Sequence, residues 1–87
     1  MYSYQTTGTC SSLITFDVDD NNRLHNVQFL GGCNGNLQGI SRLVEDMDVD
    51  QAIARLEGIR CNGGPTSCPD QLAQALNQYK IKTGRLA

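Results

Sequence analysis

Four cysteines constrain what this chain of 87 residues can fold into: Cys10, Cys33, Cys61 and Cys68. A domain of this size buries only a modest hydrophobic core, and small domains often add a disulfide or a metal ion as a staple. The first eight residues contain no apolar stretch typical of a secretion signal, so we expect a cytoplasmic protein. Disulfides are rare in that compartment, and the cysteines therefore indicate metal ligands or redox thiols.

The predicted position of each cysteine is more informative than the spacing, because no pair forms a Cys-x-x-Cys motif. Each is expected just beyond the end of a helix or strand. Cys68 opens the last helix, where free backbone N–H groups stabilise a thiolate. Thiols in such places can converge, and four thiolates suit zinc or an iron–sulfur cluster. The candidate metal ligands are therefore Cys10, Cys33, Cys61 and Cys68, and the supporting loop residues are Gly32, Asn34, Gly35, Ser67 and Asp70.

Two alternatives to a four-cysteine metal site remain open from the residues alone. Cys10 can pack as a buried structural thiol, since a free cysteine behaves as a small hydrophobic residue. Cys61 and Cys68 can form a redox pair, because the loop that joins them is short and contains Gly63 and Gly64.

The hydrophobic pattern predicts three strands followed by three helices. Tyr2 and Tyr4 indicate a short first strand, and two β-rich segments over 13–18 and 24–30 flank the turn-forming residues 19–22. A Gly/Asn-rich loop is expected over 31–36, and helices over 37–44, 49–57 and 69–82. This order predicts an α+β fold, in which a three-stranded antiparallel sheet is followed by three helices packed on one face, in a single domain over 1–87.

Individual residues define the expected ends and inner faces of these elements. Asp48 caps the second helix with Gln51 in the capping-box position, and Gly58 ends it. Ser67 caps the last helix, with Pro69 in its first turn. The residues expected to face inward are Ile14, Phe16 and Val18, Val27 and Phe29, then Leu37, Ile40, Leu43 and Val44 on the first helix, and Leu72, Leu76 and Tyr79 on the last.

The charge balance and the remaining polar residues exclude several classes of function. A net charge of −2 gives no basic surface for a nucleic-acid partner, and no apolar run is long enough for a membrane span. His25 is expected as a surface residue in mid-strand. Asp17, Asp19 and Asp20 lack calcium-loop spacing and are expected at a solvated hairpin tip.

The string Thr66-Ser67-Cys68-Pro69-Asp70 resembles the signature of the TSCPD domain family. Segments 32–41, 58–61 and 71–76 are also similar to that family, so the resemblance extends from Tyr2 to about Lys80. The same domain occurs at the C-terminus of adenosylcobalamin-dependent ribonucleotide reductases. The resemblance therefore implies a link to deoxyribonucleotide synthesis, with a ribonucleotide reductase or a redox protein as the partner. Since the chain has no motif for cobalamin or a nucleotide, we expect an accessory module and not an autonomous enzyme.

A more distant resemblance is to iron–sulfur cluster scaffold proteins. The order of elements is similar, Val49-Asp50-Gln51-Ala52 resembles a scaffold motif, and Cys10, Cys33 and Cys68 match the three scaffold cysteines. Ser12 and Ser67 stand where scaffold proteins carry an aspartate and a histidine. Three functions are thus predicted: a metal-binding accessory module, which we favour, a cluster scaffold or carrier, and a thiol redox protein that uses Cys61 and Cys68.

Overall fold

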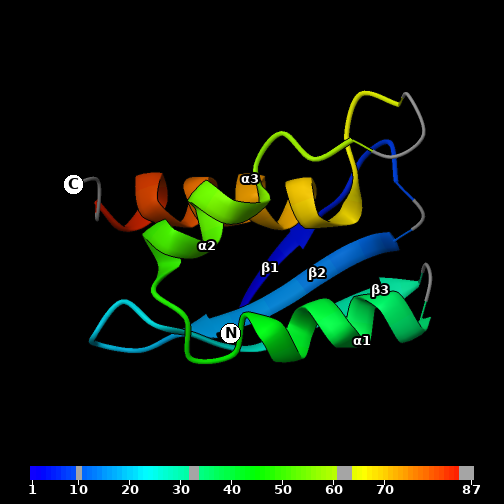
Figure 1. Ribbon diagram of the computed structural model, residues 1–87. Coiled ribbons are helices and arrows are strands. Elements are labelled where there is room, and N and C mark those ends of the chain that lie inside the picture. Colours follow the sequence, from blue (N-terminus) through cyan, green and yellow to red (C-terminus); the bar gives the residue numbers. More distant parts are fainter. Residues whose placement is uncertain (10, 32–33, 61–63, 85–87) are drawn as a thin grey trace.

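The computed structural model describes residues 1–9, 11–31, 34–60 and 64–84. Three strands, β1 (Tyr2–Gln5), β2 (Ser11–Val18) and β3 (Leu24–Gly31), are followed by three helices. The helices are α1 (Asn34–Leu43), α2 (Val49–Leu56) and α3 (Cys68–Thr83), as Figure 1 shows. This order confirms the predicted α+β fold. Over the described residues, no helix has the length and apolar content to cross a bilayer.

The strands form one antiparallel sheet in the order β1-β2-β3, with β2 in the centre. Ile14 on β2 lies opposite Tyr4 on one side and Phe29 on the other. The hairpin turn forms as predicted, because the carboxylate of Asp19 accepts hydrogen bonds from the backbone N–H groups of Asn21 and Arg23.

Two irregularities in the β2–β3 ladder change which side chains face the core. One register shift lies between Thr15 and Asp17, opposite the positive φ of 56° at Asn26, and it turns both Leu24 and Val27 inward. The other lies between Ser11 and Leu13. Strict alternation from Ile14 would orient position 12 inward, but the shift buries Ser11 instead and leaves Ser12 exposed.

Helix α3 supplies the centre of the core, as its sequence predicts. Leu72 and Leu76 are fully buried in one cluster with Ile14 and Phe16. The ring of Tyr79 makes edge contacts with Tyr2 and Phe16, at centroid distances of 4.6 and 6.1 Å. The side chains at 72, 76 and 79 follow the spacing that places them on one helix face, which explains why periodicity found them.

Helix α1 departs from its prediction in two respects. It begins at Asn34, so part of the expected loop over 31–36 is helical. Leu43, which we expected to face inward, is 77% exposed, whereas Leu37 and Val44 are buried. Seven residues make almost two helical turns, so Val44 lies nearly above Leu37 and Leu43 is rotated away by about 100°.

Helix α2 is held at both ends by the residues that the sequence indicated. Asp48 caps it by accepting a hydrogen bond from the N–H of Gln51, at 3.1 Å. Gly58 follows the helix with a φ of +84°. The connection between α1 and α2, residues 44–48, also pairs with the start of β3, since Leu24 donates to Met47 O and accepts from Asp46 N. The buried face of α2 consists of Val49, Ala52 and Ile53.

The contrast between two leucines tests this description of the core. Leu76→Ala is expected to lower the free energy of unfolding by about 2–5 kcal/mol, because it opens a cavity beside Leu72 and Phe16. Leu43→Ala removes the same atoms from an exposed side chain and is expected to change stability by no more than about 0.5 kcal/mol. Chemical denaturation followed by circular dichroism measures both, and equal losses would contradict the assigned orientation of α1.

Candidate functional site

The segment Thr66 to Asp70, which we call the signature segment, builds the N-terminus of α3. Ser67 is the N-cap: its hydroxyl oxygen accepts a hydrogen bond from the N–H of Asp70 at 3.2 Å. The same hydroxyl donates to the carbonyl oxygen of Ile59 at 2.6 Å. Pro69 occupies the first turn, where the absence of its N–H costs nothing. Ser67 therefore starts the helix and fixes the incoming loop with one side chain.

The carboxylate of Asp70 is the buried anchor of the signature segment. One of its oxygens accepts from the backbone N–H of Gly58 at 2.7 Å. The other accepts from the hydroxyl of Thr66 and from the amide of Gln74, the latter at 2.9 Å. The bond from Thr66, together with those from Gly58 and Gln74, holds the pKa of Asp70 below its ordinary value, although burial acts in the opposite direction.

The side chain of Gln71 extends this network to the loop between β1 and β2. Its amide nitrogen donates to the Thr66 hydroxyl at 3.1 Å, and its amide oxygen accepts from the N–H of Thr7 at 3.1 Å. Gly8, with a φ of +71°, lies close against the methyl group of Thr66. A Cβ at this position would be 3.3 Å from that methyl carbon. The signature segment therefore packs directly on the β1–β2 loop.

Cys68 lies in this setting, with its sulfur 3.1 Å from the hydroxyl oxygen of Ser11. Ser11 is only 4% exposed, and Thr9 contacts it through a second hydroxyl at 3.3 Å. A helix N-terminus favours the thiolate over the thiol. The arrangement can therefore support a nucleophilic or metal-binding sulfur at position 68.

The other predicted ligands, Cys10, Cys33 and Cys61, lie outside the described residues, as does Gly32. Asn34 and Gly35 are in the first turn of α1 and not in a loop. The described neighbours of the cysteines come together: Ser11 pairs with Gly31 across the β2–β3 ladder, and Ile59 is bound to Ser67. Figure 1 shows the start of β2, the end of β3 and the start of α3 at the same end of the molecule.

Sequence reasoning did not identify Ser11 or Gln71 as residues of the site. Ser11 is separated from Cys68 by 57 positions and turns inward only because of the ladder irregularity beside it. Gln71 left a weak signal, since it is a polar residue directly before the buried pair Leu72 and Ala73, and it is itself 2% exposed. A buried amide of this kind needs partners, which here come from another loop.

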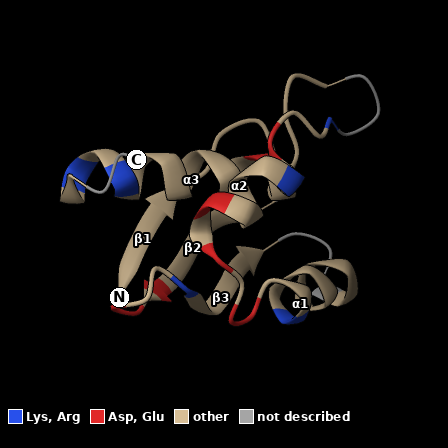
Figure 2. Cartoon of the chain, turned by 60° about the vertical axis from the view of Figure 1, so that its left-hand side comes forward, with Lys and Arg blue, Asp and Glu red and all other residues tan. Residues whose placement is uncertain are grey.

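A second polar cluster surrounds His25 at the opposite end of the sheet. Its two ring nitrogens lie 2.8 Å from a carboxylate oxygen of Asp19 and 2.6 Å from one of Glu45. Those contacts, the one to Asp19 first, raise the pKa of His25 from 6.5 to about 8. Figure 2 shows several acidic residues near the β2–β3 turn and the α1–α2 connection.

This histidine cluster joins two parts of the fold. Glu45 also accepts a hydrogen bond from the N–H of Asn26, at 2.9 Å, so it ties β3 to the α1–α2 connection. Ligand atoms of Asp19, His25 and Asp46 lie within 4.8 Å of one another, a geometry that a cation also accepts. Because both imidazole nitrogens face carboxylates, the hydrogen bonds of a protonated histidine account for the arrangement.

Comparison with known proteins gives one match. The family model for the TSCPD domain matches residues 2–80 of the chain. Neither the curated proteins nor the solved structures include a match. The match includes the signature segment and the residues of the β1–β2 loop that pack on it.

The anchoring role of Asp70 predicts a large effect of a small chemical change. Asp70→Asn replaces an acceptor oxygen by a donor that faces N–H and O–H groups, so we expect a loss of about 1–3 kcal/mol in the free energy of unfolding. Asp20→Asn makes the same change at an exposed position and is expected to cost no more than about 0.5 kcal/mol. Urea titration compares them; similar losses would show that Asp70 does not anchor the segment.

The same anchor gives stability a pH dependence on the acidic side. The lowered pKa of Asp70 means that its contribution is present above the pKa of the unfolded chain and is lost as the pH falls toward the folded value. Asp70→Asn should therefore remove part of the acid sensitivity of the wild type.

The contacts of His25 predict that stability also falls on the alkaline side, in the direction opposite to the effect of Asp70. Because the pKa of His25 is raised in the folded protein, its protonated ring stabilises the fold fully below about pH 6.5. This stabilisation is lost as the pH rises through about 8. The melting temperature of the wild type should fall more between about pH 6 and about pH 9 than that of His25→Gln. As His25 is the only histidine, proton NMR can follow its titration directly. A ring that titrates near its ordinary value, with equal pH dependence in both proteins, would contradict the two-carboxylate contact.

Proposed function

Since the chain belongs to the TSCPD domain family, we propose that it is a metal-binding accessory module linked to deoxyribonucleotide synthesis. In this proposal Cys68 holds the metal as a thiolate together with Cys10, Cys33 and Cys61, and the module works in the cytoplasm beside a ribonucleotide reductase or a redox protein. The reductase link comes from the family resemblance. The metal proposal rests on the surroundings of Cys68.

The observation that carries the metal proposal is the convergence of the residues next to the cysteines. Ser11 is adjacent in sequence to Cys10 and contacts both Gly31 and Cys68. Cys33 follows Gly31 by two residues, and Cys61 follows Ile59 by two residues. Two residues of chain span at most about 7 Å, so this arrangement of their described neighbours supports a site that the four cysteines share.

The surroundings of Cys68 fit a thiolate-bound cation. The Ser11 hydroxyl lies within hydrogen-bond distance of the sulfur, and hydrogen-bonding groups commonly surround metal-bound thiolates. Asp70, a buried carboxylate in the first turn of the helix, already has both oxygens engaged by three donors. The donor set offered to a metal is therefore sulfur, which suits zinc or iron–sulfur chemistry and not magnesium or calcium.

Two serines favour a permanently held ion over a transferable cluster. Ser67 uses its hydroxyl both to accept from Asp70 and to donate to Ile59, so it offers nothing in place of the scaffold histidine. Ser12 is exposed and donates to the carbonyl oxygen of Leu30, at 3.2 Å. We therefore place a structural zinc ion ahead of the scaffold or carrier function.

Metal binding predicts a stability change that depends on the cysteines. Protein purified without oxygen and without a metal-affinity tag should contain zinc, and zinc added to the apo protein should raise its melting temperature. A free ion at about a thousandfold above its Kd stabilises a fold by about 4 kcal/mol. Single Cys→Ser changes at positions 10, 33, 61 and 68 should each reduce this gain, whereas Ser12→Ala, an exposed neighbour, should not.

Differential scanning fluorimetry with and without zinc, combined with elemental analysis, makes the comparison. Brown protein that contains iron and sulfide in place of zinc would favour the scaffold function. An equal rise of the melting temperature in the wild type and in all four cysteine variants would show that the thiols do not share a site.

A further inference from the structure

The edge of the sheet at β3 has an open groove beside it. We propose that the groove between β3 and α1 binds an extended, apolar and acidic segment of a partner protein, which adds to the sheet as a fourth strand next to β3. This inference is independent of metal binding, because none of the residues that it uses belongs to the signature segment or contacts it through a hydrogen bond described above.

β3 is an edge strand, and its two halves differ in whether the backbone on the outer edge is hydrogen-bonded. The first half is covered, because the backbone of Leu24 pairs with Asp46 and Met47, and the N–H of Asn26 donates to Glu45. Over residues 27–31, the only hydrogen bonds with other described elements are those to β2. An uncovered strand edge presents a row of N–H and C=O groups that can pair with another extended chain.

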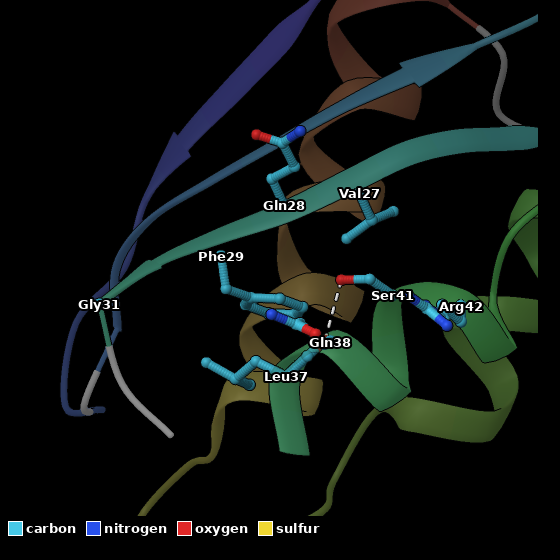
Figure 3. A pocket seen from close by; sticks show the side chains of 8 residues that line it. All are labelled: Val27, Gln28, Phe29, Gly31, Leu37, Gln38, Ser41 and Arg42. Atoms are coloured by element: carbon cyan, nitrogen blue, oxygen red, sulfur yellow. Dashed lines mark hydrogen bonds between the residues drawn. The ribbon is translucent and has the colours of Figure 1, made fainter. Parts of the chain in front are cut away.

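The groove runs along this uncovered half and has a volume of about 330 Å³. Val27 and Phe29 line it from β3, and Leu37 and Ser41 line it from α1, as Figure 3 shows. Gln28 and Gly31 line it as well. Successive residues of a strand point to opposite faces, so lining by 27, 28 and 29 together means that the groove follows the strand edge.

Apolar surface lies on both sides of the edge, as a pairing strand requires. Inside the groove, Phe29 is half-buried and supplies most of the apolar surface, whereas Val27 and Leu37 are only 5% and 6% exposed. On the outer face of the sheet, Leu30 is 63% exposed and borders a smaller hollow with Leu13. An added strand would place alternate side chains against these two surfaces.

The charge of the groove selects an acidic segment. Arg42 is the only charged residue among the described residues that line it. Within the described chain Arg42 forms no ion pair, whereas the acidic groups nearest in sequence, Glu45 and Asp46, are engaged with His25 or the backbone of β3. A carboxylate on the partner would supply the missing counter-charge at this rim.

NMR titration of the labelled full chain tests the proposal. The probe is the acetylated and amidated peptide Thr-Val-Glu-Val-Thr, used at up to about 5 mM. We expect chemical-shift changes confined to residues 27–31 and 37–42. The matched Thr-Val-Lys-Val-Thr peptide should bind more weakly, and a version that is N-methylated at every residue, which cannot complete the strand pairing, should not bind.

Charge reversal separates recognition from nonspecific attraction. Arg42→Glu should weaken binding of the glutamate peptide by about three- to fivefold, the size of an exposed ion pair, and strengthen binding of the lysine peptide. Arg55→Glu makes the same change on an exposed face of α2 and should alter neither. Circular dichroism confirms that both variants fold.

Three results would overturn the proposal. One is the absence of shifts at residues 27–31 with the glutamate peptide. Another is an equal response to glutarate, which would show a site for small anions only. The last is a peptide-free, concentration-dependent shift of the same residues, which would identify a second copy of the chain as the occupant. Zinc binding by the cysteines is measured separately and does not enter any of these outcomes.

Discussion

The buried carboxylate of Asp70 is the interaction on which the signature end of this protein depends. It collects donors from the end of α2, from the residue before the α3 cap and from the next turn of α3. A buried carboxylate is costly unless such donors surround it, so the three segments are held in one arrangement or the site is lost. Ser67 and Gln71 extend the same arrangement to Ile59 and Thr7.

This network explains how a short string of small and polar residues acts as one structural unit. Thr66 donates to Asp70, Ser67 donates to Ile59, and Pro69 sets the first helical turn. The remaining member, Cys68, is presented to Ser11 by the fixed helix start. Four of the five residues therefore fix the helix start, and Cys68 supplies the thiol that can take part in chemistry.

Different kinds of interaction stabilise the two ends of the sheet. At the signature end, hydrogen bonds to a buried carboxylate and a buried amide fix the loops, and these bonds are shielded from solvent. At the other end, a half-exposed histidine between Asp19 and Glu45 joins the hairpin to the α1–α2 connection, and its contribution depends on protonation. Between them, no described element pairs with the outer edge of the second half of β3, which lies beside α1.

The sequence by itself determined the elements whose signals are local. Alternation at Ile14 and Phe16, the caps at Asp48 and Ser67, and the inward spacing of Leu72, Leu76 and Tyr79 needed only the periods of strand and helix. These signals were sufficient for the order of elements and for the antiparallel hairpin. They also placed Cys68 at the start of α3, which is where its chemistry is favoured.

The tertiary structure alone decided everything that depends on how two segments fit. Ser11 faces Cys68 because an irregularity in the β2–β3 ladder turns it inward. Such a register shift depends on how two strands pair and pack on the core, so the residues of one strand do not reveal it. Leu43 is exposed because Val44 takes the inward place as α1 ends. The partners of Asp70 and Gln71 come from residues up to 64 positions away, a distance that no local pattern can report.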